Sequence, residues 1–340
     1  MSVPKPLLTA LQGQSIQPTP LWLMRQAGRY LPEYRQLRER AGGFLDLCLT
    51  PELAAEATLQ PIRRFGFDGA ILFSDILIIA KALGRAVTFR DGDGPSLLPL
   101  ANVDGLTAQP DASVLAPVYA AVRKVKASLP VATTLLGFAG GPWTVAAYVI
   151  DGSGRTQFTK ARDLAQENPA ALDAIVTRLS DATAAHLIAQ LDASADAVQI
   201  FDSWAGLLPP EQFRRWVIAP TQRIVAAVHA RHPQAAIIGF PRNAGTLYAE
   251  YFAETGVNAL CIDQAVPLTQ AHELQKHGPV QGNLDPTVLV AGGAALDRAV
   301  ADILATLGQR AFVFNLGHGI LPETPLAHVE RLVRLVRGGP

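Results

Sequence analysis

Eight short apolar runs, each followed by polar or glycine residues and then by a helical pattern, constrain the fold of this chain more than any other feature. Continuous apolar runs of this length are typical of strands buried on both faces, as in a parallel sheet. Eight of them alternating with helices in 340 residues predict an α/β fold, a single (β/α)8 or TIM barrel spanning residues 1–340. The runs are Leu21–Met24, Ala70–Phe73, Val131–Phe138, Ala197–Phe201, Ala235–Phe240, Val257–Ile262, Val280–Leu284 and Ala311–Leu316.

Three other stretches have a distinct pattern. Pro169–Leu191 is the clearest amphipathic helix, with Asn168 as its expected N-cap. The glycine-rich segment Arg90–Pro95 (RDGDGP) predicts a small hairpin excursion near residues 86–100. The uncharged stretch Ala127–Ile150 is long enough to cross a bilayer, but its central glycines and proline indicate a buried strand, a turn and a helix instead.

Composition excludes several classes of protein. The chain is 49% hydrophobic and 29 basic residues balance 29 acidic ones, which excludes intrinsic disorder and argues against nucleic acid or a membrane surface as a partner. Two cysteines, Cys48 and Cys261, give neither a disulfide framework nor a cysteine-based zinc site. The first twenty residues lack the apolar core of a secretory signal, so we expect a cytoplasmic protein.

A barrel of this kind carries its active site at the carboxyl ends of the strands, so the residues that follow each run are the candidates. Two chemistries compete there. Four aspartates could gather around a divalent metal, or arginines and a histidine could bind an acidic substrate while one buried aspartate faces a developing cation. No lysine lies directly at a strand end, which argues against Schiff-base chemistry. The first set is Asp75, Asp202, Asp263 and Asp285, and the second is Arg25, Arg29, Arg242 and His318.

Two longer segments and three short ones carry a family resemblance. Pro20–Arg35 reads PLWLMRQAGRYLPEYR and Gly137–Thr144 reads GFAGGPWT; both look like signature segments of the uroporphyrinogen decarboxylases. The likeness continues in order through Phe73–Leu77 (FSDIL), Gln281–Asp285 (QGNLD) and Asn315–Gly319 (NLGHG), so it spans nearly the whole chain. The chain is identified on these motifs as a member of that family.

The resemblance implies an activity and its partners. Members of the family remove the four acetate carboxyls of uroporphyrinogen III to give coproporphyrinogen III in heme and tetrapyrrole biosynthesis. They use a (β/α)8 barrel, usually as a homodimer, and need neither a metal nor an organic cofactor. A pyrrole ring protonated at its α-carbon can itself accept the electrons that the departing CO2 leaves behind. The expected partners are therefore a small-molecule tetrapyrrole and a second copy of the chain.

The resemblance also assigns roles to residues of the first segments. Asp75 matches the essential aspartate, whose carboxylate can accept hydrogen bonds from the pyrrole N–H groups and stabilise the cationic intermediate. Arg25 and Arg29 match two arginines suited to bidentate contacts with substrate carboxylates, and Arg29 is expected to assist a proton transfer or receive the departing carboxylate. Backbone contacts to the substrate are expected from Gln26, Ala27 and Gly28.

Three residues further along the chain complete the expected site. Tyr148 and Ser203 match positions where the family places hydroxyls against substrate carboxylates or the catalytic aspartate. His318 matches a histidine near the substrate side chains, which could bind a propionate or relay a proton at neutral pH. The catalytic set expected from the resemblance is Asp75, Arg29, Tyr148 and His318.

Some positions depart from the family pattern. Asp202 stands where a glutamate is common, and we assign it no chemistry at this point. Leu49 occupies a position that is basic in many relatives, and Arg242 replaces a lysine often found there, so their contributions stay open.

Three rival functions remain. A metal-dependent enolisation at the strand-end aspartates is kept as a chemical alternative. A corrinoid-dependent methyltransferase of the same scaffold would carry a zinc-binding His-x-Cys pair, and neither cysteine has a histidine two residues before it. A porphyrinogen-binding protein without catalysis is the alternative from a different class.

Overall fold

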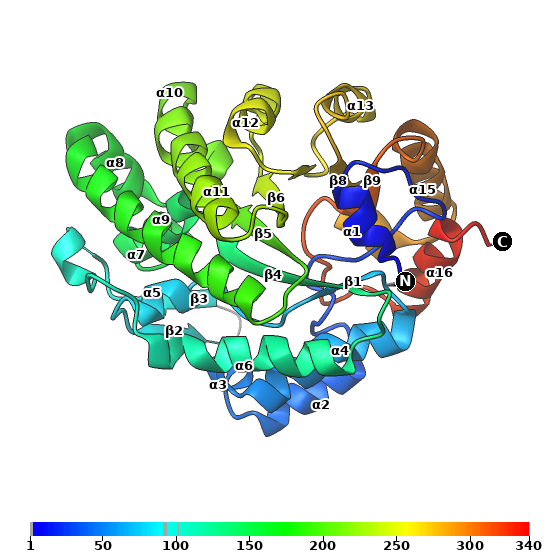
Figure 1. Cartoon of the computed structure of the whole chain (residues 1–340), viewed down its shortest axis with the longest axis horizontal. Coiled ribbons are helices and arrows are strands. Elements are labelled where there is room, and N and C mark those ends of the chain that lie inside the picture. The colour runs from blue at the N-terminus through cyan, green and yellow to red at the C-terminus, as the bar shows by residue number, and fades with distance from the viewer. Residues whose placement is uncertain (1–2, 91–93, 101, 340) are drawn as a thin grey trace.

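The computed structural model describes residues 3–90, 94–100 and 102–339. Its centre is a curled parallel sheet of seven strands, in the order β1-β4-β5-β6-β7-β8-β9, with helices around its outer side (Figure 1). Nearly every residue of these strands is buried, so both faces of the sheet are covered, as the continuous apolar runs predict. The strands are β1 (Gly69–Ile71), β4 (Thr134–Gly140), β5 (Ala197–Asp202), β6 (Ala236–Pro241), β7 (Ala259–Cys261), β8 (Val280–Leu284) and β9 (Phe312–Leu316).

The helices connect these strands and bury their apolar stripes against them. The longest, α9, runs from Pro169 to Asp192, and the Asn168 side chain accepts a hydrogen bond from the backbone N–H of Ala171, so the predicted helix and its cap are confirmed. The others are α1 (Pro6–Leu11), α2 (Pro32–Arg40), α3 (Phe44–Leu49), α4 (Pro51–Phe65), α5 (Ile78–Ala82), α6 (Ala112–Ser128), α7 (Pro142–Asp151), α8 (Thr159–Glu167), α10 (Pro210–Phe213), α11 (Ala219–Arg231), α12 (Tyr248–Thr255), α13 (Leu268–Leu274), α14 (Pro286–Ala291), α15 (Gly293–Leu307) and α16 (Leu326–Val336).

The first apolar run does not form a regular strand. Of the predicted strand Leu21–Met24, only Leu21 makes a bridge, with Phe314 of β9. Side chains bind the next backbone donors: Gln26 Oε1 accepts from the N–H of Leu23 and Asn315 Oδ1 accepts from that of Met24. Because these amides are bound to side chains, the chain leaves the extended ladder after its first residues and turns toward the site. Seven of the eight predicted strands are confirmed.

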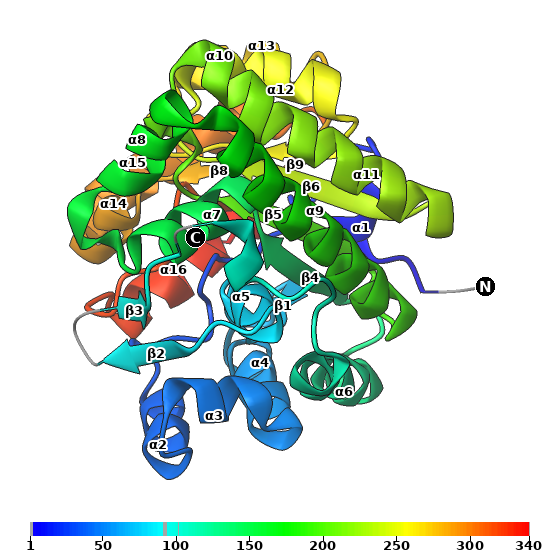
Figure 2. The same cartoon turned by 90° about the vertical axis from the view of Figure 1, so that its left-hand side faces the viewer.

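A second, two-stranded sheet lies apart from the large one. β2 (Val87–Arg90) and β3 (Gly94–Leu97) pair in antiparallel fashion, with Val87 opposite Leu97, within the stretch where a hairpin is expected. Residues 91–93, which join them, lie outside the described residues. Figure 2 shows this pair projecting from the large sheet near α2 and α3. It thereby brings residues of β2 and β3 to the rim of the cavity described below.

The uncharged stretch near the middle of the chain forms a strand followed by a helix. Residues 134–140 form β4, and after Gly141 the chain continues as α7, as the sequence predicts. In the described part of the chain, no helix combines the length and apolar character needed to span a bilayer.

Candidate active site

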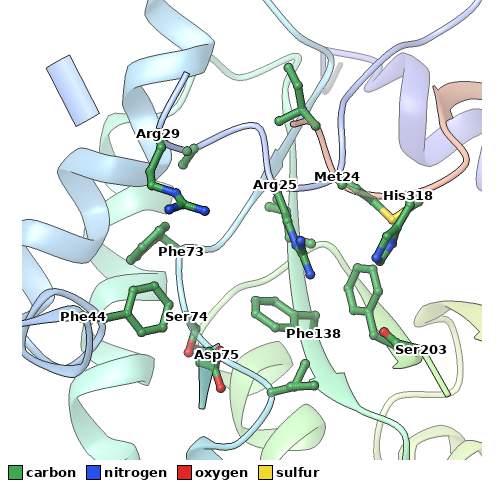
Figure 3. A pocket seen from close by; sticks show the side chains of 18 of the residues that line it. Met24, Arg25, Arg29, Phe44, Phe73, Ser74, Asp75, Phe138, Ser203 and His318 are labelled. Atoms are coloured by element: carbon green, nitrogen blue, oxygen red, sulfur yellow. The ribbon is translucent and has the colours of Figure 1, made fainter. Parts of the chain in front are cut away.

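A cavity of about 490 Å³ opens at the carboxyl ends of β1, β4, β5 and β9. Eight of the nine residues expected at the site line it: Arg25, Ala27, Gly28, Arg29, Asp75, Tyr148, Ser203 and His318. They come from five segments that are far apart in the sequence and meet only because parallel strands end at the same side of the sheet. In Figure 3 the guanidinium of Arg25 points into the cavity between Asp75 and His318.

Gln26 is the exception: it does not line the cavity, and its expected backbone contact with substrate stays a prediction. Its side chain is fully buried beneath the loop, where it donates to the carbonyl of Gly69 and accepts from the N–H of Leu23. Its backbone groups are also bound, since the N–H donates to Leu23 and the carbonyl accepts from the Tyr30 hydroxyl. With all these groups engaged inside the protein, Gln26 supports the loop that carries Arg25 and Arg29.

Arg25 has an unusual backbone for an arginine. Its φ is 60°, in the left-handed region that non-glycine residues seldom adopt. Such a conformation costs about 1 kcal/mol or more and persists where the surrounding structure enforces it. A Cβ on Gly319 would lie 2.3 Å from Cδ of Arg25, so only glycine leaves room for this side chain to reach the cavity. The NLGHG segment therefore shapes the path of Arg25.

Asp75 follows β1 and has an elevated pKa. Burial raises the pKa of its carboxyl to about 6, against the opposing effects of the Leu77 N–H and the charge of Arg25. Its Oδ1 accepts a hydrogen bond from that N–H at 2.8 Å. The carboxylate therefore lies in a place where a nearby positive charge is strongly stabilised, because little water competes with it.

His318 faces the cavity as a neutral imidazole. Burial, together with the positive charges of Arg25 and Arg242, lowers its pKa to about 3. Within the described residues its Nδ1 is buried without a hydrogen-bond partner. At neutral pH the ring is therefore uncharged, and a hydrogen bond to a ligand would satisfy its Nδ1.

Tyr148 and Ser203 reach the cavity from neighbouring elements. Tyr148 lies on α7, where burial raises the pKa of its hydroxyl, and its ring packs edge-on against Phe158 with centroids 4.9 Å apart. Ser203 follows β5 directly.

Arg29 lies at the opposite edge of the cavity and is largely exposed. Within the described residues no carboxylate is paired with its guanidinium. The cavity thus presents hydroxyls and free cationic groups.

The apolar wall of the cavity is the part that sequence reasoning missed. Aromatic rings contribute much of it, and several touch one another, such as Phe44 with Phe73 at 5.8 Å and Phe138 with Phe201 at 5.6 Å between centroids. These phenylalanines lie inside runs or helices, where the sequence pattern indicates only core. An apolar, aromatic wall with charged groups around it fits a cyclic polyanion built of aromatic rings. The lining aromatic residues are Tyr30, Tyr34, Phe44, Phe73, Phe89, Phe138, Tyr148 and Phe201.

The four strand-end aspartates do not gather. Asp202 binds Thr144, Asp263 accepts from the Tyr248 hydroxyl, and Asp285 caps α14 through the N–H of Thr287. Asp75 is the only one of the four that lines the cavity. Among the described residues, no three His, Cys, Asp or Glu side chains are grouped as metal ligands. Of the two sets that the sequence left open, three members of the arginine and histidine set line the cavity together, namely Arg25, Arg29 and His318.

The positions that depart from the family pattern lie outside the cavity wall. Arg242 is half-buried, and its positive charge helps to lower the pKa values of Arg25 and His318. Leu49 packs against the core at the end of α3. Both cysteines are buried, and neither lines the cavity.

Comparison with known proteins identifies the family. The family model described as "Uroporphyrinogen decarboxylase (URO-D)" matches residues 3–339. The chain belongs to the uroporphyrinogen decarboxylase family. Among curated members, the uroporphyrinogen decarboxylase of Sphingopyxis alaskensis is 57% identical over 339 residues, covering 99% of both chains. Those of Chelativorans sp. and Rhodospirillum rubrum are 54% and 51% identical, covering 98% and 99% of both chains.

Solved structures add a comparison of folds. A methyltransferase from Methanosarcina mazei superimposes on this decarboxylase family member with a TM-score of 0.80 over 98% of this chain and 97% of that one, at 20% identity. A B12-independent methionine synthase from Shewanella sp. W3-18-1 gives a TM-score of 0.58 at 11% identity, covering 99% and 94%. At these identities the likeness shows a shared fold and carries no function.

Proposed function

We propose that the chain decarboxylates the acetate side chains of uroporphyrinogen in this cavity, with Asp75 as the central catalytic group. The observation that carries the proposal is the pairing of a half-buried carboxylate of raised pKa with cationic groups in an apolar, aromatic-walled space. A tetrapyrrole with carboxylates at its rim and N–H groups at its centre is complementary to that arrangement. The family membership of the chain points to the same substrate.

The reaction needs one proton for each CO2 released. A proton added to the pyrrole α-carbon makes the ring cationic, and the C–C bond to the carboxylate then breaks with its electron pair moving into the ring. CO2 leaves, a proton adds to the exocyclic carbon to give the methyl group, and loss of the α-proton restores the pyrrole. Asp75 accepts hydrogen bonds from the pyrrole N–H groups and stabilises the cation as it forms. In this scheme the ring is the electron sink, and no metal or organic cofactor is required.

Arg25, Arg29 and His318 would hold the substrate carboxylates. The arginine fork gives two parallel hydrogen bonds to a carboxylate, which fixes both position and orientation. Arg29, at the open side, meets the arriving polyanion and assists at the carboxylate that departs. His318 donates a hydrogen bond as a neutral imidazole, which its unpartnered buried Nδ1 and lowered pKa both favour.

Tyr148 and Ser203 would orient the reacting ring from the other side. Their hydroxyls would bind substrate carboxylates or the Asp75 carboxylate, and the charge of Asp75 already contributes to the raised pKa of the Tyr148 hydroxyl. Ala27 and Gly28 line the cavity and would contribute backbone contacts.

The finer architecture proposed for this scaffold is a closed eight-stranded (β/α)8 barrel. Two observations support closure by the segment at Leu21. Its carbonyl accepts from the N–H of Asp68, at the start of β1, and it bridges to Phe314 of β9 on the other side. Across the interior, Gln281 of β8 donates to Gln199 of β5, although these strands are separated by two others in the sheet. Both features are expected if the sheet curls fully round.

The oligomeric state and the cellular location of the protein are proposed from its resemblance to the uroporphyrinogen decarboxylases. We propose a two-fold homodimer in the cytoplasm, binding no nucleic acid. Light scattering coupled to size-exclusion chromatography at micromolar concentration tests the dimer, and a monomeric mass would contradict it.

Anaerobic incubation with uroporphyrinogen III in the presence of a chelator tests the proposed reaction. Products are oxidised and separated by carboxyl number, and a ladder from eight carboxyls to four is expected. Activity that disappears with chelator and returns with added metal would overturn the cofactor-free scheme. Folded protein that binds the tetrapyrrole without producing any ladder would favour the porphyrinogen-binding alternative.

A further inference from the structure

Asp202, the last residue of β5, is almost fully buried outside the cavity and is bound to the first turn of α7. Its Oδ1 accepts from both the backbone N–H and the hydroxyl of Thr144. The same hydroxyl accepts a hydrogen bond from the backbone N–H of Trp204 at 3.0 Å. The Thr144 hydroxyl therefore connects the carboxylate at the end of β5 with the loop that follows it.

Two more contacts join the same two elements. The Gly141 N–H donates to the carbonyl of Phe201 at 2.8 Å, and the indole N–H of Trp143 donates to the carbonyl of Trp204 at 3.0 Å. The end of β5 and the start of α7 thus form one hydrogen-bonded unit. A change in this hydrogen-bonded unit would displace the end of β5 and the start of α7 together.

Both elements carry a residue of the proposed site. Tyr148 follows Thr144 by four positions on α7, so the two lie one above the other on one helix face. Ser203 stands between Asp202 and Trp204 in the chain. A single buried network therefore fixes the relative position of the two hydroxyls proposed to orient the substrate.

Burial of the Asp202 carboxyl costs desolvation free energy, and an apolar side chain that only filled this space would not incur that cost. Burial raises the pKa of its carboxyl to about 7, and within the described residues its Oδ2 is buried without a partner. A Cβ on Gly141 would lie 2.4 Å from that oxygen, so the chain leaves space for the carboxyl at this point. An apolar residue there would avoid the desolvation cost but could not bind Thr144.

We propose that Asp202 is a positioning residue that acts through the Thr144 hydroxyl to hold Tyr148 in its reactive orientation relative to Ser203. The inference rests on the proposed function of the cavity. It predicts that loss of the Thr144 hydroxyl slows turnover through Tyr148 and leaves substrate capture by the arginines largely intact.

The test compares Thr144→Val with Thr144→Ser in the full-length protein, using uroporphyrinogen III under anaerobic conditions. Thr144→Val keeps the shape of the side chain and removes the hydroxyl, and we expect kcat to fall by about ten- to hundredfold while KM changes by less than about threefold. Thr144→Ser keeps the hydroxyl and should retain kcat within about twofold of the unsubstituted chain, since the same bonds can form. Thr255→Val removes a buried threonine hydroxyl that binds only the Tyr251 carbonyl on α12, and should leave kcat unchanged.

A double substitution distinguishes positioning from general loss of stability. If Thr144 acts through Tyr148, Thr144→Val should reduce the kcat of Tyr148→Phe by less than about twofold, since the group being positioned is already gone. Normal kcat in Thr144→Val, failure of Thr144→Ser to retain activity, or full multiplication of the two losses would each overturn the inference. If the unsubstituted chain releases no CO2, the proposed function fails instead, so the two failures are distinguishable.

Discussion

Arg25 and Asp75 attract each other across the cavity, yet burial shifts the pKa of both groups toward their neutral forms. The guanidinium lowers the pKa of Asp75 and the carboxylate raises that of Arg25, while desolvation is the larger effect on each. The two opposite charges thus face each other in the cavity without cancelling, Asp75 half-buried and Arg25 still partly open to solvent. A substrate carboxylate beside Arg25 and a forming cation beside Asp75 would offset the desolvation cost of each charge. Because the cation forms only in the transition state, Asp75 stabilises that state more than the bound substrate, which is what catalysis requires.

Asp75→Asn should remove most of the turnover and stabilise the fold. The amide cannot offer a negative charge to the cationic ring, so a loss of at least about a hundredfold in kcat is expected. Because burial raises the Asp75 pKa from 3.8 to about 6, ionised Asp75 destabilises the folded state by up to about 3 kcal/mol at pH 8. The asparagine variant should therefore unfold at a higher temperature at pH 8, and its advantage should shrink as the pH falls toward 4. Near-normal turnover would remove Asp75 from the mechanism.

The pH dependence of kcat/KM should show an acidic limb near pH 6. Asp75 must be ionised to stabilise the cation, and with a pKa of about 6 it becomes protonated and ineffective below that pH. His318, with a pKa of about 3, should contribute no change between pH 5 and 8. Rates measured from pH 5 to 8 check this. A limb that persists in the residual activity of Asp75→Asn would assign it to another group.

Arg29→Lys should weaken substrate binding. A lysine keeps the charge but replaces the two-pronged contact with a single donor, so the loss of one charged hydrogen bond should raise KM by about tenfold or more. Arg40→Lys is the matched control, because Arg40 is exposed at the end of α2 and outside the cavity wall. Equal KM values for both variants would contradict bidentate binding at Arg29.

Gln26→Leu should lower both stability and activity without removing any group from the cavity. The change leaves the Leu23 N–H and the Gly69 carbonyl unpaired in the interior, at about 1–3 kcal/mol each. The loop that carries Arg25 and Arg29 would loosen, so KM should rise together with a lower midpoint of thermal unfolding. Gln36→Leu, at an exposed position on α2, serves as the control. A raised KM with unchanged unfolding would instead indicate direct contact of Gln26 with substrate.

The strand pattern and the site differ in how far the sequence alone could predict them. Seven of the predicted strands form because a continuous apolar run has one low-energy solution in a covered sheet, burial on both faces. The run at Leu21–Met24 has the same composition, but Asn315, 291 residues away in the sequence, binds the N–H of Met24, and such a contact leaves no local signal. The same limit hid the phenylalanines of the cavity wall, which are indistinguishable from core residues until the strands are brought together.

By itself the sequence determined the alternation of strands and helices, the family, and the chemical types available at the strand ends. Those properties depend on local periodicity and on motifs of consecutive residues. Only the tertiary structure decided which strand-end groups share a cavity: Arg25, Asp75 and His318 do, while Asp202, Asp263 and Asp285 bind elsewhere in the protein. The reason is that the curvature of the sheet and the packing of its helices set the distances between loops, and these depend on contacts across the whole chain.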